Sequence, residues 1–145
     1  MAKNSFAVEN PQGLTDAIFA LDEIASESVL RQAAVAGVRV VHAEVKVRTP
    51  IANKAYERKS TKIYPGFLRD RIIIAYDKEV SVPGRIASYI VTWTKEAFYG
   101  RFVEHGTSKM GAKPFLRPGY EAKKQAAAAK VGEVIQAKVK ELTSG

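Results

Sequence analysis

A stripe of small and apolar residues predicts a long helix at about residues 27 to 47. These residues recur at i, i+3, i+4 and i+7 spacing: Leu30, Ala33, Ala34, Gly37, Val38, Val41 and Val45. Ser26 precedes the stripe, where its side chain can accept hydrogen bonds from the free N–H groups of the first turn. Pro50 disfavours helical backbone at Thr49 and ends the helix. We expect another element to approach this stripe closely.

Two apolar runs after this helix predict paired β-strands. The first, at 68–76, contains three consecutive isoleucines, Ile72 to Ile74, which suit a buried strand. The second, at 86–94, alternates between a more apolar and a more polar face, and a turn around Pro83 and Gly84 separates the two. The next segment, 97–103, is compatible with a third strand or a short helix.

The last stripe predicts a helix from Tyr120 to Leu142. Alanine and lysine dominate this segment, and its apolar positions form one face: Ala127, Ala128, Val131, Val134, Ile135, Val139 and Leu142. We expect it to pack on the sheet or on the first long helix. The order of elements predicts one α+β domain over 14–145, with a small antiparallel β-sheet packed against a long N-terminal and a long C-terminal helix.

Two polar segments complete this organisation. Residues 1–13, with Pro11 and Gly13 as breakers, predict a flexible N-terminal arm that orders only against a partner. A short helix should follow it, since apolar residues recur at helical spacing: Leu14, Ile18, Leu21 and Ile24. Residues 51–65 have no sustained periodicity and are rich in Lys, Arg, Ser, Thr and Tyr, which predicts a long exposed basic loop.

Composition narrows the class of protein. No apolar run approaches the ~20 residues of a membrane span, and the start of the chain does not resemble a signal peptide, so we expect a protein of the bacterial cytoplasm without a membrane partner. The absence of cysteine excludes disulfides and thiolate metal sites, so stability must come from packing or from partner subunits.

The net charge of +8 favours an anionic partner, either nucleic acid or an acidic protein surface. Basic residues concentrate between positions 46 and 71, and we take six of them as a candidate interaction surface: Lys54, Arg58, Lys59, Lys62, Arg69 and Arg71. Interleaved Tyr56, Tyr64 and Phe67 are compatible with contacts to nucleic acid. Because no DNA-binding fold accompanies the charge, nucleic acid is the secondary interpretation and a solvated loop the simpler one.

The residues that could carry chemistry are few. The two histidines, His42 and His105, lack metal-ligand spacing, and the scattered glycines match no nucleotide fingerprint, so we expect no metal and no cofactor. Glu104 beside His105 could be imagined as a general base with an orienting partner. No nucleophile motif accompanies the pair, and we expect no catalytic residue there.

Two blocks near the end of the chain carry a family resemblance. They are Tyr-Gly-Arg-Phe-Val-Glu-His-Gly-Thr at 99–107 and Lys-Pro-Phe-Leu-Arg-Pro-Gly at 113–119. With weaker matches at 48–50 and 66–72, they resemble the tail-completion and minor tail component family of lambda-like siphophages, over about residues 14–142. The chain departs from the family pattern at four positions: Pro65, Arg71, His105 and Gly119.

The resemblance implies a structural phage or prophage protein that acts in tail completion or head-tail joining, not an enzyme. It implies tail or connector proteins as partners, a ring-forming homo-oligomer, and a place in the virion tail or neck after assembly in the host cytoplasm. One alternative is a DNA-contacting basic protein of the head-tail passage. Another is a hydrolase built on Glu104 and His105.

The same blocks predict a structural turn between sheet and helix. Its residues are Glu104, Gly106, Thr107, Pro114, Arg117 and Pro118. Glycine suits a tight turn, threonine can bond nearby backbone, and the prolines fix φ at two positions. Arg117 lies near a helix start, where the dipole disfavours a cation, so we predict that Glu104 pairs with its side chain.

Overall fold

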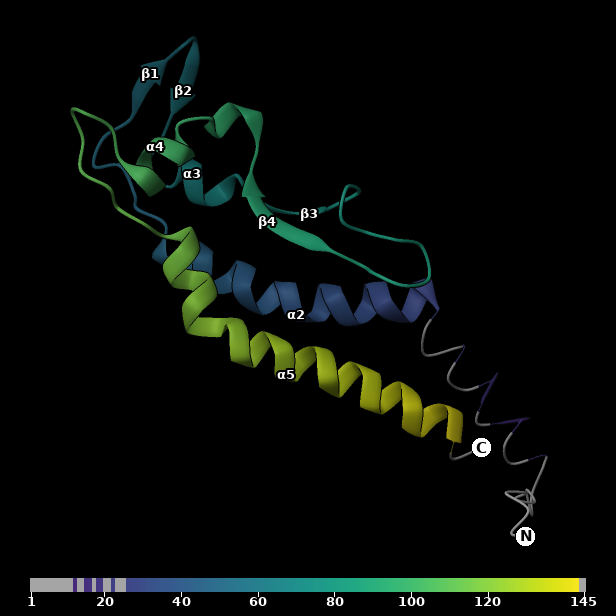
Figure 1. Cartoon of the computed structure of the whole chain (residues 1–145). Helices are drawn as coiled ribbons and strands as arrows, with labels where there is room; N and C mark the ends of the chain where they lie inside the picture. The colour runs from purple at the N-terminus through teal and green to yellow at the C-terminus, as the bar shows by residue number, and fades with distance from the viewer. Residues whose placement is uncertain (1–11, 13–14, 17, 20–21, 23–25, 144–145) are drawn as a thin grey trace, which may run out of the picture.

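The computed structural model describes residues 12, 15–16, 18–19, 22 and 26–143. Its largest elements are two long helices, and its strands form two small antiparallel sheets. The elements are α2 (Glu27–Arg48), β1 (Tyr56–Arg58), β2 (Thr61–Ile63), α3 (Phe67–Asp70), β3 (Ile72–Tyr76), β4 (Tyr89–Trp93), η1 (Lys95–Ala97), α4 (Gly100–His105) and α5 (Leu116–Thr143). Helix α2 contacts α5, β3 and β4 (Figure 1). The predicted α+β class is confirmed, with the strands divided between two sheets.

The side chains of Ser26 and Thr49 cap the two ends of helix α2. The Ser26 hydroxyl accepts a hydrogen bond from the N–H of Val29 at 3.4 Å. At the other end Thr49 is extended, with φ of −63° and ψ of 125°, and its hydroxyl donates to the carbonyl of Val45 at 2.7 Å. The predicted helix and its Ser26 cap are therefore confirmed.

Strands β3 and β4 form the predicted pair on α2. In their register Ile72 faces Trp93 and Ile74 faces Val91, and this side of the sheet turns toward the core. The other side is open, since Ile73 is 39% exposed. The start of the predicted first strand is instead the short helix α3, and the open choice over 97–103 is resolved as η1 followed by α4.

The predicted loop at 51–65 contains a β-hairpin. Strands β1 and β2 pair with Glu57 opposite Lys62, and the two residues that join them, Lys59 and Ser60, have φ values of 46° and 64°. Positive φ at both central residues is the backbone of a type I′ turn, which Asn-Gly or Asp-Gly usually signals. Neither pair occurs here, so no turn signal predicted these two short strands within the long exposed basic loop. Most of the hairpin is exposed, but Ile63 is 2% exposed and belongs to the core.

The buried core lies where the C-terminal half of α2 meets the hairpin, α3, α4 and the start of α5. Its members are Val41, Val45, Ile63, Phe67, Leu68, Ile72, Ala97, Tyr99 and Phe115. Burial raises the pKa of the Tyr99 hydroxyl to about 12. We call this end of the molecule, where these core side chains are at most 8% exposed, the closed end.

Helix α5 starts at Leu116, ahead of the predicted Tyr120, and packs along α2 through small residues. A Cβ built on Gly37 of α2 would lie 2.6 Å from a methyl of Val131, and one built on Gly119 would lie 2.7 Å from a methyl of Val45. Within α5 only Gly119 is buried. The two helices thus approach closely, while most side chains of α5 remain partly or fully exposed.

The predicted N-terminal arm, residues 1–13, lies outside the described residues except for Gln12, and the short helix predicted after it is described only in part. Among the described helices, none combines the length and the apolar character that crossing a membrane requires.

Candidate functional site

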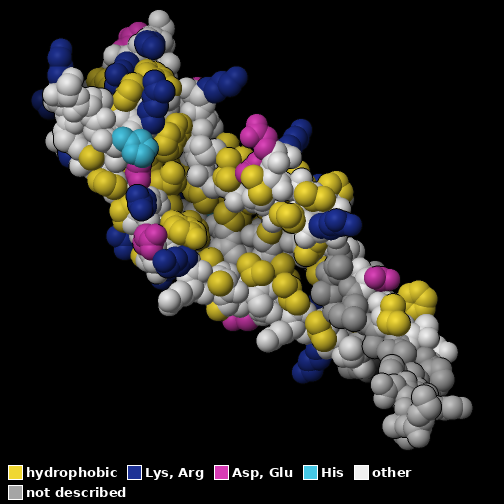
Figure 2. All heavy atoms as spheres, viewed as in Figure 1, with side chains coloured by type: hydrophobic (Ala, Val, Ile, Leu, Met, Phe, Trp, Pro, Cys, Tyr) yellow, Lys and Arg dark blue, Asp and Glu magenta, His cyan; other side chains and the backbone are white. Residues whose placement is uncertain are grey.

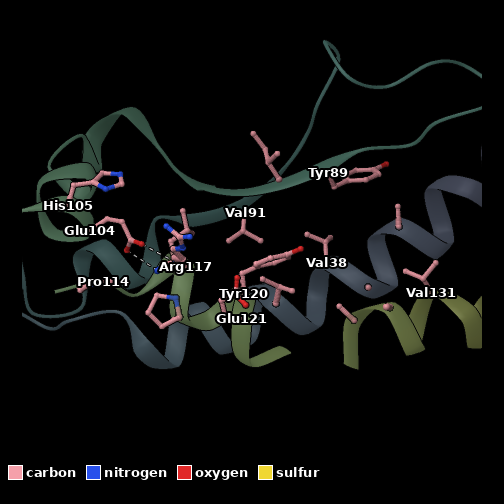
Figure 3. Close-up of a pocket in the computed structure, with 18 residues that line it drawn as sticks. Val38, Tyr89, Val91, Glu104, His105, Pro114, Arg117, Tyr120, Glu121 and Val131 are labelled. Carbon is pink, nitrogen blue, oxygen red and sulfur yellow. Dashed lines mark hydrogen bonds between the residues drawn. The ribbon is translucent and has the colours of Figure 1, made fainter. Parts of the chain in front are cut away.

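Glu104 is a buried carboxylate that closes the N-terminus of α5. It is 6% exposed, and its oxygens accept hydrogen bonds from the backbone N–H groups of Phe115 (2.7 Å), Leu116 (2.9 Å) and Arg117 (3.0 Å) (Figure 3). The first N–H groups of a helix lack carbonyl partners within it, and the helix dipole favours an anion beside them. Glu104 is therefore an N-cap that a different helix, α4, supplies.

These hydrogen bonds also set the ionisation of Glu104. Burial is the largest single effect and raises the pKa of the carboxyl group, but the three backbone N–H groups together outweigh it, so the pKa lies below its ordinary value. The carboxylate is ionised at neutral pH with both oxygens engaged. His105, beside it, is exposed at the end of α4. The pair therefore lacks the geometry of a general base with an orienting histidine.

The predicted ion pair between Glu104 and Arg117 is wrong. Arg117 donates its backbone N–H to Glu104, while its side chain is exposed. The groups that lower the pKa of Glu104 are backbone N–H groups and, more weakly, His105. The helix dipole favours the Glu104 carboxylate at this N-terminus, and the Arg117 guanidinium avoids the dipole by remaining in water.

The other predicted turn residues connect α4 to α5. Gly106 has a φ of 78°, and a Cβ there would lie 2.8 Å from a backbone nitrogen of the following loop. Thr107 donates its N–H to the carbonyl of Met110 at 2.8 Å and forms an isolated bridge with it. Pro114 lies in the loop, and Pro118 lies in the first turn of α5, where a missing N–H breaks no helical hydrogen bond. These residues bring the start of α5 over Glu104.

The structure divides the six cations of the candidate interaction surface. Two are simply exposed, Lys54 and Lys62. Two pack near their own segment: Arg69 forms a 3.3 Å salt bridge with Asp70, and the Arg71 guanidinium lies 4.9 Å from the centre of the Phe67 ring. The last two, Arg58 and Lys59, both lie over the ring of Phe98.

Arg58 and Lys59 belong to a group that we call the hairpin cluster. Its members are Arg58, Lys59, Phe98, Arg101 and Phe102. Lys59 Nζ lies 4.7 Å from the centre of the Phe98 ring, and the guanidinium of Arg101 lies 4.9 Å from that of Phe102. Cations attracted to ring faces tie the hairpin to α4. Sequence reasoning missed the two rings and Arg101, because only the fold brings them to the hairpin.

Figure 2 shows Lys and Arg side chains gathered at the end of the molecule that carries the hairpin, and a hollow lined by hydrophobic side chains farther along. The hollow is a groove of about 1030 Å³ between α2, β4 and α5, which we call the α2–β4–α5 groove. Val38, Val91 and Tyr120 contribute to its lining from these three elements (Figure 3). No sequence pattern predicted it, since three separate elements form its walls.

No cluster of three or more His, Cys, Asp or Glu side chains that could hold a metal ion occurs in the described part of the chain. His42 Nε2 lies 2.9 Å from the carbonyl oxygen of Ile72 and donates to it. This ring therefore links α2 to the start of β3.

Comparison with known proteins identifies one family. Residues 13–106 match the model of the HK97-gp10-like family, which is described as "Bacteriophage HK97-gp10, putative tail-component". The match includes the whole of α2 and continues through the strands to the end of α4. No curated protein and no solved structure matches the chain.

Proposed function

The chain belongs to the HK97-gp10-like family of bacteriophage tail components, and we propose that within this class it acts in tail completion or head-tail joining during virion assembly. The family match carries this proposal. We further propose that it binds tail or connector proteins and other copies of itself in a ring, without turnover chemistry. Its place is then the tail or neck of the virion, after assembly in the cytoplasm of the host.

Two surfaces of the molecule support an assembly role. A closed ring uses head-to-tail interfaces, in which two different patches of each subunit meet. This chain has an apolar groove along α2 and α5. At the far end of α2 it has a hairpin with Lys62 exposed on β2 and Lys54 exposed just before β1. Apolar area supplies affinity at such contacts, whereas exposed charge mainly steers and orients the partners.

The test is deletion of the gene from its phage or prophage, followed by electron microscopy of the lysate. We expect separate filled heads and tails, or tails of abnormal length, and few infectious particles. Supplying the wild-type gene on a plasmid should restore joined particles. Normal numbers of joined, infectious particles without the gene would contradict a role in completion or joining.

The basic end of the molecule favours a second candidate, contact with DNA at the head-tail passage. Lys54 and Lys62 are exposed on or beside the hairpin, and Arg101 lies nearby in the hairpin cluster. Binding through phosphates releases counterions, so affinity for duplex DNA should fall steeply as salt rises. A steep slope that flattens when Lys54 and Lys62 are neutralised would favour this candidate, and absence of binding at low salt would exclude it.

A further inference from the structure

The α2–β4–α5 groove leaves apolar side chains without a covering layer. Val38 of α2, Val91 of β4 and Val131 of α5 line it, and each is only partly buried. Farther along α5, Val139 is still 36% exposed. Apolar depressions of this size mark protein–protein interaction sites or ligand-binding grooves.

The described part of the segment ahead of α2 has the opposite character, because its two large apolar side chains are exposed. Its described residues are helical, and the amide of Gln12 donates to the carboxylate of Asp16 at 3.0 Å. Ile18 is 51% exposed and Phe19 is 66% exposed. These two side chains therefore do not fill the groove of their own chain.

Charge distinguishes the same segment from the rest of the molecule. Residues 12–25, which we call the acidic segment, contain Asp16, Asp22 and Glu23 and neither lysine nor arginine, while the whole chain carries +8. The acidic segment thus offers apolar side chains and carboxylates to an open apolar groove whose α5 wall carries six Lys and Arg against three Glu.

We propose that the acidic segment of one copy docks in the α2–β4–α5 groove of a second copy. An amphipathic helix in an apolar groove anchors through residues at i, i+4 and i+7, a spacing that Leu14, Ile18 and Leu21 follow in the sequence. The acidic segment and the groove are different surfaces, so each copy can place its segment in one neighbour and accept the segment of another in its groove. Repetition of this contact closes a ring where the rotation between copies allows it. The inference rests on the proposed function for its ring and supplies the contact that would build it.

The sequence contains no cysteine, so single cysteines can be introduced for a direct test with the whole chain. One variant carries Ile18→Cys in the acidic segment, and a second carries Ala128→Cys on the exposed groove side of α5. The two are mixed and oxidised, and non-reducing gels with mass spectrometry identify the cross-linked products. We expect a disulfide-linked dimer that contains one subunit of each variant. Glu133→Cys, exposed on the same helix but outside the groove, is the control partner and should cross-link far less.

Three results would overturn the proposal. One is the absence of a mixed dimer above the Glu133→Cys background. Another is a double variant, Ile18→Cys with Ala128→Cys, that forms only an internal disulfide, because the segment would then bind its own chain. The third is unchanged sedimentation of an Ile18→Glu, Phe19→Glu variant, which we expect to associate less while keeping its helical content, since both side chains are exposed.

These measurements use purified protein, so they fail or succeed independently of the proposed function. If gene deletion blocks assembly and the mixed dimer does not form, only the interface is wrong. If the mixed dimer forms and gene deletion leaves assembly normal, the protein self-associates as inferred but acts elsewhere.

Discussion

The hairpin end of the molecule and its α2–α5 half differ in how completely they bury their side chains. At the hairpin end Ile63, Phe67 and Phe115 are at most 3% exposed, and Glu104 satisfies the start of α5. Along the other half the apolar residues of α5 are partly buried or exposed, and the helices meet through glycines. Stability on folding therefore comes mainly from the closed end, and the open half keeps apolar area available for association.

The largest expected effect is at the junction of the two regions, in Glu104→Gln. The amide places an N–H₂ group where three backbone N–H groups need an acceptor, so buried donors lose their partners. We expect a loss of about 3 kcal/mol in the free energy of unfolding, and a melting temperature lower by about 10 °C. Urea titration and thermal melts measure both. A loss no greater than that of Glu121→Gln, on the exposed first part of α5, would contradict this role.

The pH dependence sharpens the same prediction. In the folded protein the pKa of Glu104 lies below 4.5, so its stabilising contribution is complete above that pH and is lost as pH falls through the lower folded-state value. The Gln variant has no such titration. The difference in stability between the two proteins should therefore shrink as the solution is made more acidic, and a constant difference down to acid unfolding would argue against a charge effect.

The next effect compares two glycines of the open half. Gly37→Ala forces a Cβ within 2.6 Å of a Val131 methyl and 3.1 Å of the Ala127 carbonyl oxygen, whereas a Cβ on Gly132 meets no atom within 4 Å. Alanine gains about 1 kcal/mol over glycine in a helix. We expect Gly132→Ala to stabilise by up to about 1 kcal/mol, and Gly37→Ala to destabilise by about 1 to 2 kcal/mol through overpacking. Equal gains in urea titrations of both variants would show that α2 and α5 are not tightly packed at Gly37.

A smaller effect is expected from Phe98→Leu, which loosens the hairpin within the closed end. The ring lies 5.3 Å from the Arg58 guanidinium and 4.7 Å from Lys59 Nζ, and its loss should cost about 1 kcal/mol. In the wild type we expect trypsin to cut first at the exposed Lys54 and Lys62. In the variant, cleavage after Arg58 and Lys59 should accelerate. Tyr120→Leu, which removes an exposed ring outside the hairpin cluster, should leave the order of cleavage unchanged.

The smallest effect on stability is expected for Lys54→Gln with Lys62→Gln. Both side chains are exposed, so the free energy of unfolding should change by less than about 0.5 kcal/mol. If the hairpin end steers a partner, assembly in a complementation assay should slow and lose part of its salt dependence. Lys78→Gln with Lys140→Gln removes the same charge from exposed sites elsewhere on the chain. Indistinguishable particle yields from the two double variants would remove this end from the steering surface.

Local signals made several elements predictable. Ser26 and the residues around Pro50 fix the ends of α2 through contacts within a few positions, and both ends match the prediction. The isoleucine run and the alternation after Pro83 located β3 and β4 for the same reason. The start of α5 was placed too late because its cap comes from Glu104, which no rule about neighbouring residues could supply.

The remaining differences depend on contacts between distant segments. The hairpin has no recognisable turn pair, although Lys59 and Ser60 adopt positive φ, and its burial of Ile63 depends on side chains from other elements. Glu104 was predicted to pair with the Arg117 side chain across a turn, whereas it lies within α4 and accepts hydrogen bonds from backbone N–H groups, that of Arg117 included. The groove forms only when α2, β4 and α5 are in their final positions, so the hydrophobic pattern of no single element predicts it.

The capping of α5 by α4 also determines when particular amide protons exchange with solvent. Most helix starts fray, and their first amides exchange through local opening. Here the amides of Phe115, Leu116 and Arg117 bond a buried side chain from another helix, so releasing them requires α4 to separate from α5. Their exchange should follow the unfolding of the whole closed end, while the uncovered far half of α5 exchanges by fraying. One helix thus carries both a probe of global unfolding and a probe of local motion.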